Sequence, residues 1–147
     1  MRARQTASYA RRIARCSSYR QGHEGAHHVA RGHNHEAIIA LDQRDGDGIG
    51  VARYVRDPMR PDTGEVAVTV VDEWQGRGLG TLLLDVLSVR ARQEGIRTFT
   101  ALMLARNEQM MDLFQQLGPV RIVGRGAGTV EIEVAIPDPR TLSDHRP

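Results

Sequence analysis

Residues 65–80 read Glu-Val-Ala-Val-Thr-Val-Val-Asp-Glu-Trp-Gln-Gly-Arg-Gly-Leu-Gly, an apolar strand that runs into a glycine-rich turn. The turn opens a segment with the leucine spacing of an amphipathic helix. Glycines let a backbone approach a ligand closely, and the first N–H groups of a helix have no partner inside that helix. A strand, a glycine turn and a helix in this order predict an anion site, suited to a phosphorylated cofactor.

The pattern from residue 36 onward predicts further strands and helices around this turn. Strands are expected at residues 36–41, 49–56, 65–71, 97–104, 120–123 and 129–136. Valines on both faces of 65–71 indicate a central strand. The predicted fold class is α/β, with a mixed, mostly antiparallel sheet flanked by helices.

Two helices are expected, each with a stop signal. The first ends at Gly95, and the second begins after the cap residue Asn107 and ends at Gly118. Each helix has apolar residues at helical spacing. These are Leu79, Leu82, Leu83, Val86 and Leu87 in the first helix, and Met110, Leu113, Phe114 and Leu117 in the second.

The basic residues are all arginine, and the chain has no lysine. This excludes a Walker-type phosphate loop and any Schiff base formed by the chain. The single cysteine, Cys16, excludes an internal disulfide and favours a reducing, cytoplasmic location. No run of 18 apolar residues exists, so no membrane span or membrane partner is expected.

Charged residues are distributed unevenly along the 147-residue chain. Residues 1–35 hold seven arginines against one glutamate, whereas residues 36–147 hold 13 arginines against 17 acids. We therefore predict a basic, weakly ordered tail at 1–35, one domain at 36–136 and a polar tail at 137–147. The mildly acidic domain gives no support for a nucleic-acid partner.

A zinc-like motif lies in the predicted tail. His23-Glu24-Gly25-Ala26-His27 matches H-E-x-x-H, and His33 lies where a third ligand could fall. Gly25 weakens a helix there, and only 22 residues precede the motif. No metal site is predicted, and a metallohydrolase is kept as a distant alternative.

Three features of the domain match one family. Gln75, Gly78 and Gly80 fit the pattern Q/R-x-x-G-x-G/A, the strand segment 68–70 precedes it, and Asn107 caps the next helix. Over residues 36–136 the chain resembles the GNAT family of acyl-CoA-dependent N-acyltransferases. The resemblance implies acetyl-CoA as cosubstrate and an amine acceptor, either a small molecule or a protein. The implied cofactor-binding residues are Val68, Thr69, Val70, Gln75, Gly76, Arg77, Gly78, Leu79, Gly80, Thr81 and Asn107.

The resemblance also suggests how the chemistry is divided. Glu65 is the predicted catalytic base, since the family often places a glutamate on this strand, and a backbone N–H near Val70 or Val71 is the expected oxyanion donor. Many members carry a tyrosine where this chain has Phe114, so water is expected to protonate the thiolate.

One departure from the family stands at the start of the chain. Members begin with a strand and two helices that build the acceptor side, and residues 1–35 do not resemble that unit. The N-terminal part of the fold is therefore expected to be incomplete, and a catalytically weak acyl-CoA-binding module is the alternative function. Whether the protein forms a homodimer is left open.

Overall fold

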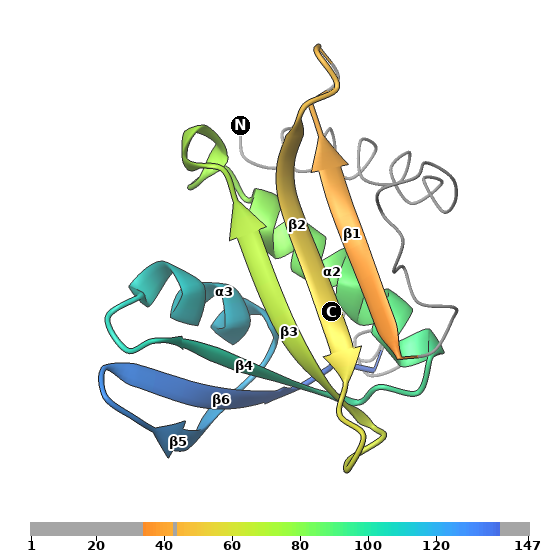
Figure 1. Ribbon diagram of the computed structural model, residues 1–147, viewed down its shortest axis with the longest axis vertical. Helices are drawn as coiled ribbons and strands as arrows, with labels where there is room; N and C mark the ends of the chain where they lie inside the picture. Colours follow the sequence, from red (N-terminus) through yellow and green to blue (C-terminus); the bar gives the residue numbers. More distant parts are fainter. Residues whose placement is uncertain (1–33, 43, 139–147) are drawn as a thin grey trace, which may run out of the picture.

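A computed structural model describes residues 34–42 and 44–138 of the chain. Within these ranges, the strands and helices follow one another in the predicted order, and a short 3-10 helix is added (Figure 1). The elements are β1 (His35–Leu41), β2 (Gly48–Arg56), β3 (Thr63–Val70), η1 (Asp72–Trp74), α2 (Leu79–Gln93), β4 (Thr98–Leu104), α3 (Glu108–Leu117), β5 (Val120–Arg125) and β6 (Thr129–Ala135).

The strands form one six-stranded sheet in the order β1-β2-β3-β4-β6-β5. Every neighbouring pair is antiparallel except β3 and β4, which are parallel. Their pairing covers only Thr63–Glu65 against Thr98–Thr100, and beyond Glu65 the two strands part (Figure 1). The predicted mixed, mostly antiparallel α/β fold is confirmed.

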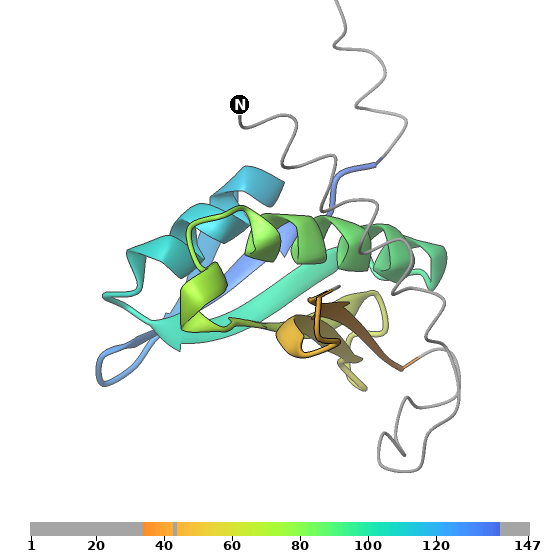
Figure 2. The same cartoon turned by 90° about the horizontal axis from the view of Figure 1, so that it is seen from above.

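Both helices lie on one side of the sheet (Figure 2). Helix α2 packs against β1, β2 and β3 and also contacts α3. The Arg90 guanidinium on α2 lies 2.6 Å from the Glu36 carboxylate on β1, which ties the end of the helix to the edge strand. The core fills the layer between sheet and helices, and its largest fully buried side chains include Tyr54, Phe99 and Phe114.

The predicted helix boundaries are confirmed by their local geometry. Gly95 follows α2 with φ +83°, a left-handed conformation that glycine adopts without steric cost. Asn107 caps α3, and its side chain accepts a hydrogen bond from the Met110 N–H at 3.1 Å. Local sequence chemistry therefore determines where each helix begins or ends.

Two packing predictions are wrong. In α2, Leu84 is fully buried, whereas Leu82 and Val86 are only partly buried at the margin of the core. In β3, the valines at 66, 68 and 70 share the face that packs on the core, whereas Glu65, Ala67 and Thr69 are exposed. The strand is central in the sheet, but the described residues cover only one of its faces.

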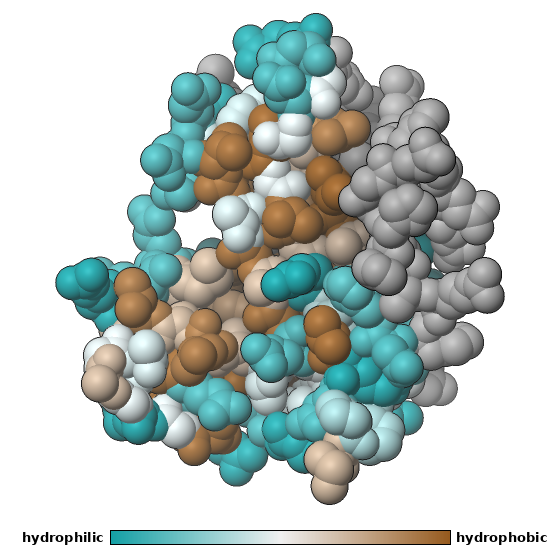
Figure 3. Space-filling model, viewed as in Figure 1, coloured by the Kyte–Doolittle hydropathy of each residue, from teal (hydrophilic) through white to brown (hydrophobic). Residues whose placement is uncertain are grey.

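The other side of the sheet carries a set of exposed apolar side chains (Figure 3). Ile39, Val55, Leu102 and Leu104 are between 41% and 67% exposed, and the register places them along β1, β2 and β4 on the side away from the helices. We call this the open sheet face. The predicted tail and its His23–His27 motif lie outside the described residues, as do residues 139–147. In the described ranges, neither helix combines the length and apolarity needed to cross a bilayer.

Candidate functional site

The glycine turn adopts the backbone that its sequence predicts. Gly76 and Gly78 have φ +73° and +82°, and α2 begins directly afterwards at Leu79. Gly78 is the N-cap and offers no side chain to the helix, so the first-turn N–H groups have no side-chain cap. A methyl group placed on the α-carbon of Gly76 or Gly78 would meet no protein atom within 4 Å. The turn therefore presents bare, positively polarised backbone to open space.

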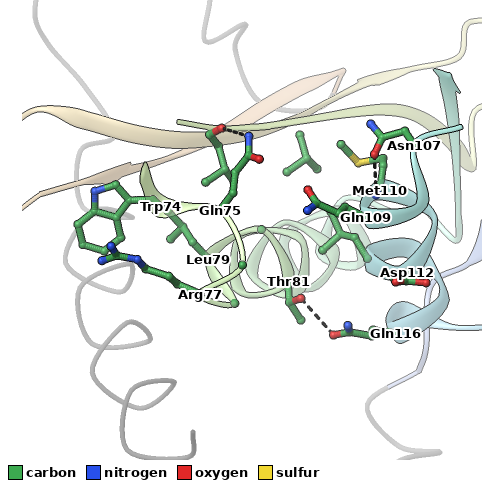
Figure 4. A pocket seen from close by; sticks show the side chains of 16 residues that line it. Trp74, Gln75, Arg77, Leu79, Thr81, Asn107, Gln109, Met110, Asp112 and Gln116 are labelled. Carbon is green, nitrogen blue, oxygen red and sulfur yellow. Dashed lines mark hydrogen bonds between the residues drawn. The ribbon is translucent and has the colours of Figure 1, made fainter. Parts of the chain in front are cut away.

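This space is a pocket of about 610 Å³ between the turn, β3 and α3 (Figure 4). Ten of the residues predicted to bind the cofactor line it. They are Val68, Val70, Gln75, Gly76, Arg77, Gly78, Leu79, Gly80, Thr81 and Asn107.

Three polar side chains fix the walls of this pocket. The Gln75 side-chain amide donates to the Val70 carbonyl and to the Asp72 carboxylate, both at 3.1 Å, which braces the turn against β3. The Thr81 hydroxyl lies 3.1 Å from the Gln116 side-chain oxygen and links α2 to α3 across the floor (Figure 4). Asn107 uses its oxygen for the helix cap, and its amide nitrogen remains a potential donor at the pocket.

The backbone of β3 supplies the upper wall. The Val71 N–H donates to the Ile49 carbonyl on β2 at 3.0 Å. Hydrogen-bonded and non-hydrogen-bonded pairs alternate along an antiparallel ladder, so the peptide groups of Val68 and Val70 point away from β2. They face the side on which β4 has parted from β3. The Val71 N–H is therefore used inside the sheet, which leaves the Val70 N–H as the remaining one of the two predicted oxyanion donors.

Glu65 and Thr69 lie outside the pocket lining. Both belong to the exposed face of β3. Glu65 is the last residue of β3 that pairs with β4, so it lies where the two strands begin to part. Along the strand it is about 10 Å from Val68, at roughly 3.3 Å per residue. The structure thus separates the predicted base from the predicted cofactor pocket, on the opposite face of the same strand.

Comparison with known proteins decides the family. The model of the acetyltransferase (GNAT) family matches residues 7–118. The chain belongs to this family. Acetyltransferase Pat of Mycolicibacterium smegmatis is 38% identical over 109 residues, which is 74% of this chain and 32% of that relative. The chain therefore spans about a third of the length of this curated relative.

Solved structures agree with this assignment. The GNAT domain of S. lividans PAT has a TM-score of 0.64 and 26% identity, and the alignment covers 91% of this chain and 85% of that domain. A cAMP-binding acyltransferase from Mycobacterium smegmatis has a TM-score of 0.62 and 30% identity, and the alignment covers 76% of this chain and 36% of that chain. The family match begins at residue 7, inside the segment predicted as a tail.

Within this GNAT chain, Phe114 and Tyr54 are core residues. Each is 1% exposed, and neither lines the pocket. Burial, together with the nearby Glu36 and Glu94 carboxylates, raises the pKa of Tyr54 to about 12. No tyrosine, histidine or cysteine of the described residues lines the pocket. The part of the chain that the structure describes therefore offers no proton donor of these types at the place where a thiol would leave.

Sequence reasoning missed most of the wall that α3 contributes. Gln109, Met110, Asp112, Leu113 and Gln116 line the pocket beside Asn107. They stand at positions i, i+1, i+3, i+4 and i+7, which lie on one broad face of a helix. The helical period could therefore have identified them as neighbours of Asn107 on one wall. Trp74 is 8% exposed and also borders the pocket.

Proposed function

We propose that this GNAT chain binds acetyl-CoA in the pocket and transfers the acetyl group to a primary amine. The observation that carries the proposal is that two features border one pocket. The first is a helix N-terminus without a side-chain cap, preceded by glycines with positive φ. The second is the part of β3 beyond Glu65, whose peptide groups on the β4 side have no strand partner among the described residues. The first feature suits a pyrophosphate, and the second suits an amide-containing arm. Coenzyme A contains both in one molecule.

The phosphate end of acetyl-CoA is assigned to the turn. Gly78 to Thr81 line the pocket at the start of α2, whose first N–H groups have no side-chain cap and whose positive end stabilises an anion. The absence of side chains at Gly76 and Gly78 lets phosphate oxygens approach the backbone directly. Both features stabilise the bound anion without any lysine in the chain.

The pantetheine arm is assigned to β3 and Asn107. The outward peptide groups of Val68 and Val70 can pair with its amides as a neighbouring strand would, although the Val70 carbonyl is shared with Gln75. The Asn107 amide nitrogen offers a further donor from the opposite wall. This arrangement directs the thioester along β3 towards the point where β3 and β4 separate.

The chemical step uses residues on both faces of β3. An amine nitrogen attacks the thioester carbonyl, the C–S bond breaks and the amide forms. The Val70 N–H faces the developing oxyanion, and Glu65 accepts the proton that the amine loses through intervening water, because the five residue steps between them span about 16 Å along the strand. The thiolate leaves and takes its proton from water, because the pocket walls in the described ranges hold no tyrosine, histidine or cysteine. The acceptor is a small amine, a protein lysine or a protein N-terminus.

Calorimetry and a thiol assay test this proposal together. Titration with acetyl-CoA should give saturable binding at one site per chain, and a panel of amines should release free thiol above the rate of hydrolysis. If acetyl-CoA does not bind, the pocket assignment is wrong. Binding without thiol release for any amine would favour the alternative of an acyl-CoA-binding module. The observation behind this alternative is that the buried Phe114 stands at the position of the family's tyrosine.

A further inference from the structure

Arg77 and Trp74 form a cation–π pair at the rim of the pocket. The Arg77 guanidinium carbon lies 5.1 Å from the centroid of the Trp74 ring. Trp74 is 8% exposed and belongs to the hydrophobic core, whereas Arg77 is exposed. Figure 4 shows the two side chains together at one end of the turn, away from the contact between Thr81 and Gln116. An anchored ring therefore supports an exposed cation.

Arg77 differs from the other paired arginines of the described residues. Arg44, Arg60, Arg90, Arg92 and Arg121 each lie within 3.4 Å of a carboxylate oxygen. Within the described ranges, no carboxylate forms an ion pair with Arg77, although the two acids of η1 stand four and five residues before it in the chain. Among the residues that the structure describes, no acid pairs with its positive charge.

The contact with the ring leaves donors available on the cation. A guanidinium carries five N–H donors, and a guanidinium held over an aromatic ring still has donors for other partners. Holding the side chain in place beforehand reduces the entropy lost when a ligand binds. A charged fork of this kind is suited to the oxygens of a phosphate.

We propose that Trp74 is a positioning residue, whose ring holds Arg77 at the pocket rim so that the guanidinium pairs with a phosphate of acyl-CoA. The inference rests on the proposed function and extends it from backbone contacts to a side-chain device. The phosphate is one of the pyrophosphate or the 3′-phosphate of coenzyme A. Both present the same chemistry to Arg77.

The chain offers an unusually direct test, because Trp74 is its single tryptophan. Growth with fluorinated tryptophans labels this position alone and weakens the negative face of the ring while keeping its shape. We expect the acetyl-CoA dissociation constant to rise with each added fluorine, by about two- to fivefold over the series. In Arg77→Gln, affinity should fall about tenfold, and the fluorine series should then have no further effect. The thermal midpoint of each labelled protein controls for packing.

Two further comparisons make the outcomes decisive. An Arg77→Gln loss that disappears with acetyl-3′-dephospho-CoA assigns the contact to the 3′-phosphate, and a loss that persists assigns it to the pyrophosphate. If the parent binds acetyl-CoA but fluorination leaves its affinity unchanged, or changes it equally in Arg77→Gln, the positioning role of Trp74 is overturned. If the parent does not bind acetyl-CoA at all, the proposed function fails first.

Discussion

The two faces of β3 differ in what covers them and in what they carry. Val66, Val68 and Val70 pack towards the helices or line the pocket, whereas Glu65, Ala67 and Thr69 are exposed on the other side. The helix-covered face combines the core with the candidate cofactor pocket. The open sheet face holds the predicted base. In the proposed function, the cosubstrate binds on the covered face of β3 and the acceptor approaches from the exposed face.

Replacing Glu65 tests whether the open sheet face takes part in the reaction. We expect Glu65→Gln to lower the turnover number by about 10²–10⁴-fold, the usual contribution of a general base. The dissociation constant of acetyl-CoA should stay near that of the parent, because Glu65 does not line the pocket. Steady-state rates and calorimetry on both proteins give the two values. An unchanged rate at every pH would remove Glu65 from the mechanism.

Stability should depend on the two faces very differently. Leu83 is 0% exposed, so Leu83→Ala should lower the free energy of unfolding by about 2–5 kcal/mol. Leu102 on the open sheet face is 67% exposed, so Leu102→Ala should change it by less than about 0.5 kcal/mol. Urea unfolding of the full-length chain measures both. A loss at Leu102 comparable with that at Leu83 would contradict the contrast between the faces.

A matched pair of glycines separates backbone strain from cosubstrate binding. Gly78 in the turn and Gly46 between β1 and β2 have φ of +82° and +80°, and neither has a protein atom near its missing side chain. A valine at either position should cost about 1–2 kcal/mol of stability. Only Gly78→Val should also weaken acetyl-CoA binding, by about tenfold or more, because its side chain enters the ligand space. Equal affinities in the two variants would show that the turn is not the phosphate site.

The last predicted effect concerns pH and the covered face of β2. The buried Tyr54 has its pKa raised to about 12, whereas tyrosine in an unfolded chain titrates near 10. The unfolded state therefore loses this proton first, and the free energy of unfolding should fall as the pH rises from about 10 to 12, by at most about 1.4 kcal/mol per pH unit. Urea unfolding across this range should give a flatter profile for Tyr54→Phe than for the parent. Identical profiles would contradict the burial of the hydroxyl.

Local features of the sequence were sufficient for much of the fold. Gly95 and Asn107 each act within one turn of chain, through a positive φ or a side-chain cap, and each ends or begins its helix as predicted. Gly78 adopts a positive φ at the start of α2. The burial of Leu84 in place of Leu82 was not predictable in this way. It depends on the angle at which α2 crosses β1, β2 and β3, which the helical period alone does not set.

The sequence by itself determined the family, the order of elements and the glycine turn, because these depend on residue types and short spacings. Only the tertiary structure decided that Val68 and Val70 turn their peptide groups to the pocket while Glu65 and Thr69 face away from it. It also made α3 the second wall of that pocket. The physical reason is the register between distant strands: β3 pairs with β4 over three residues and then parts from it, and no local segment encodes where that pairing stops.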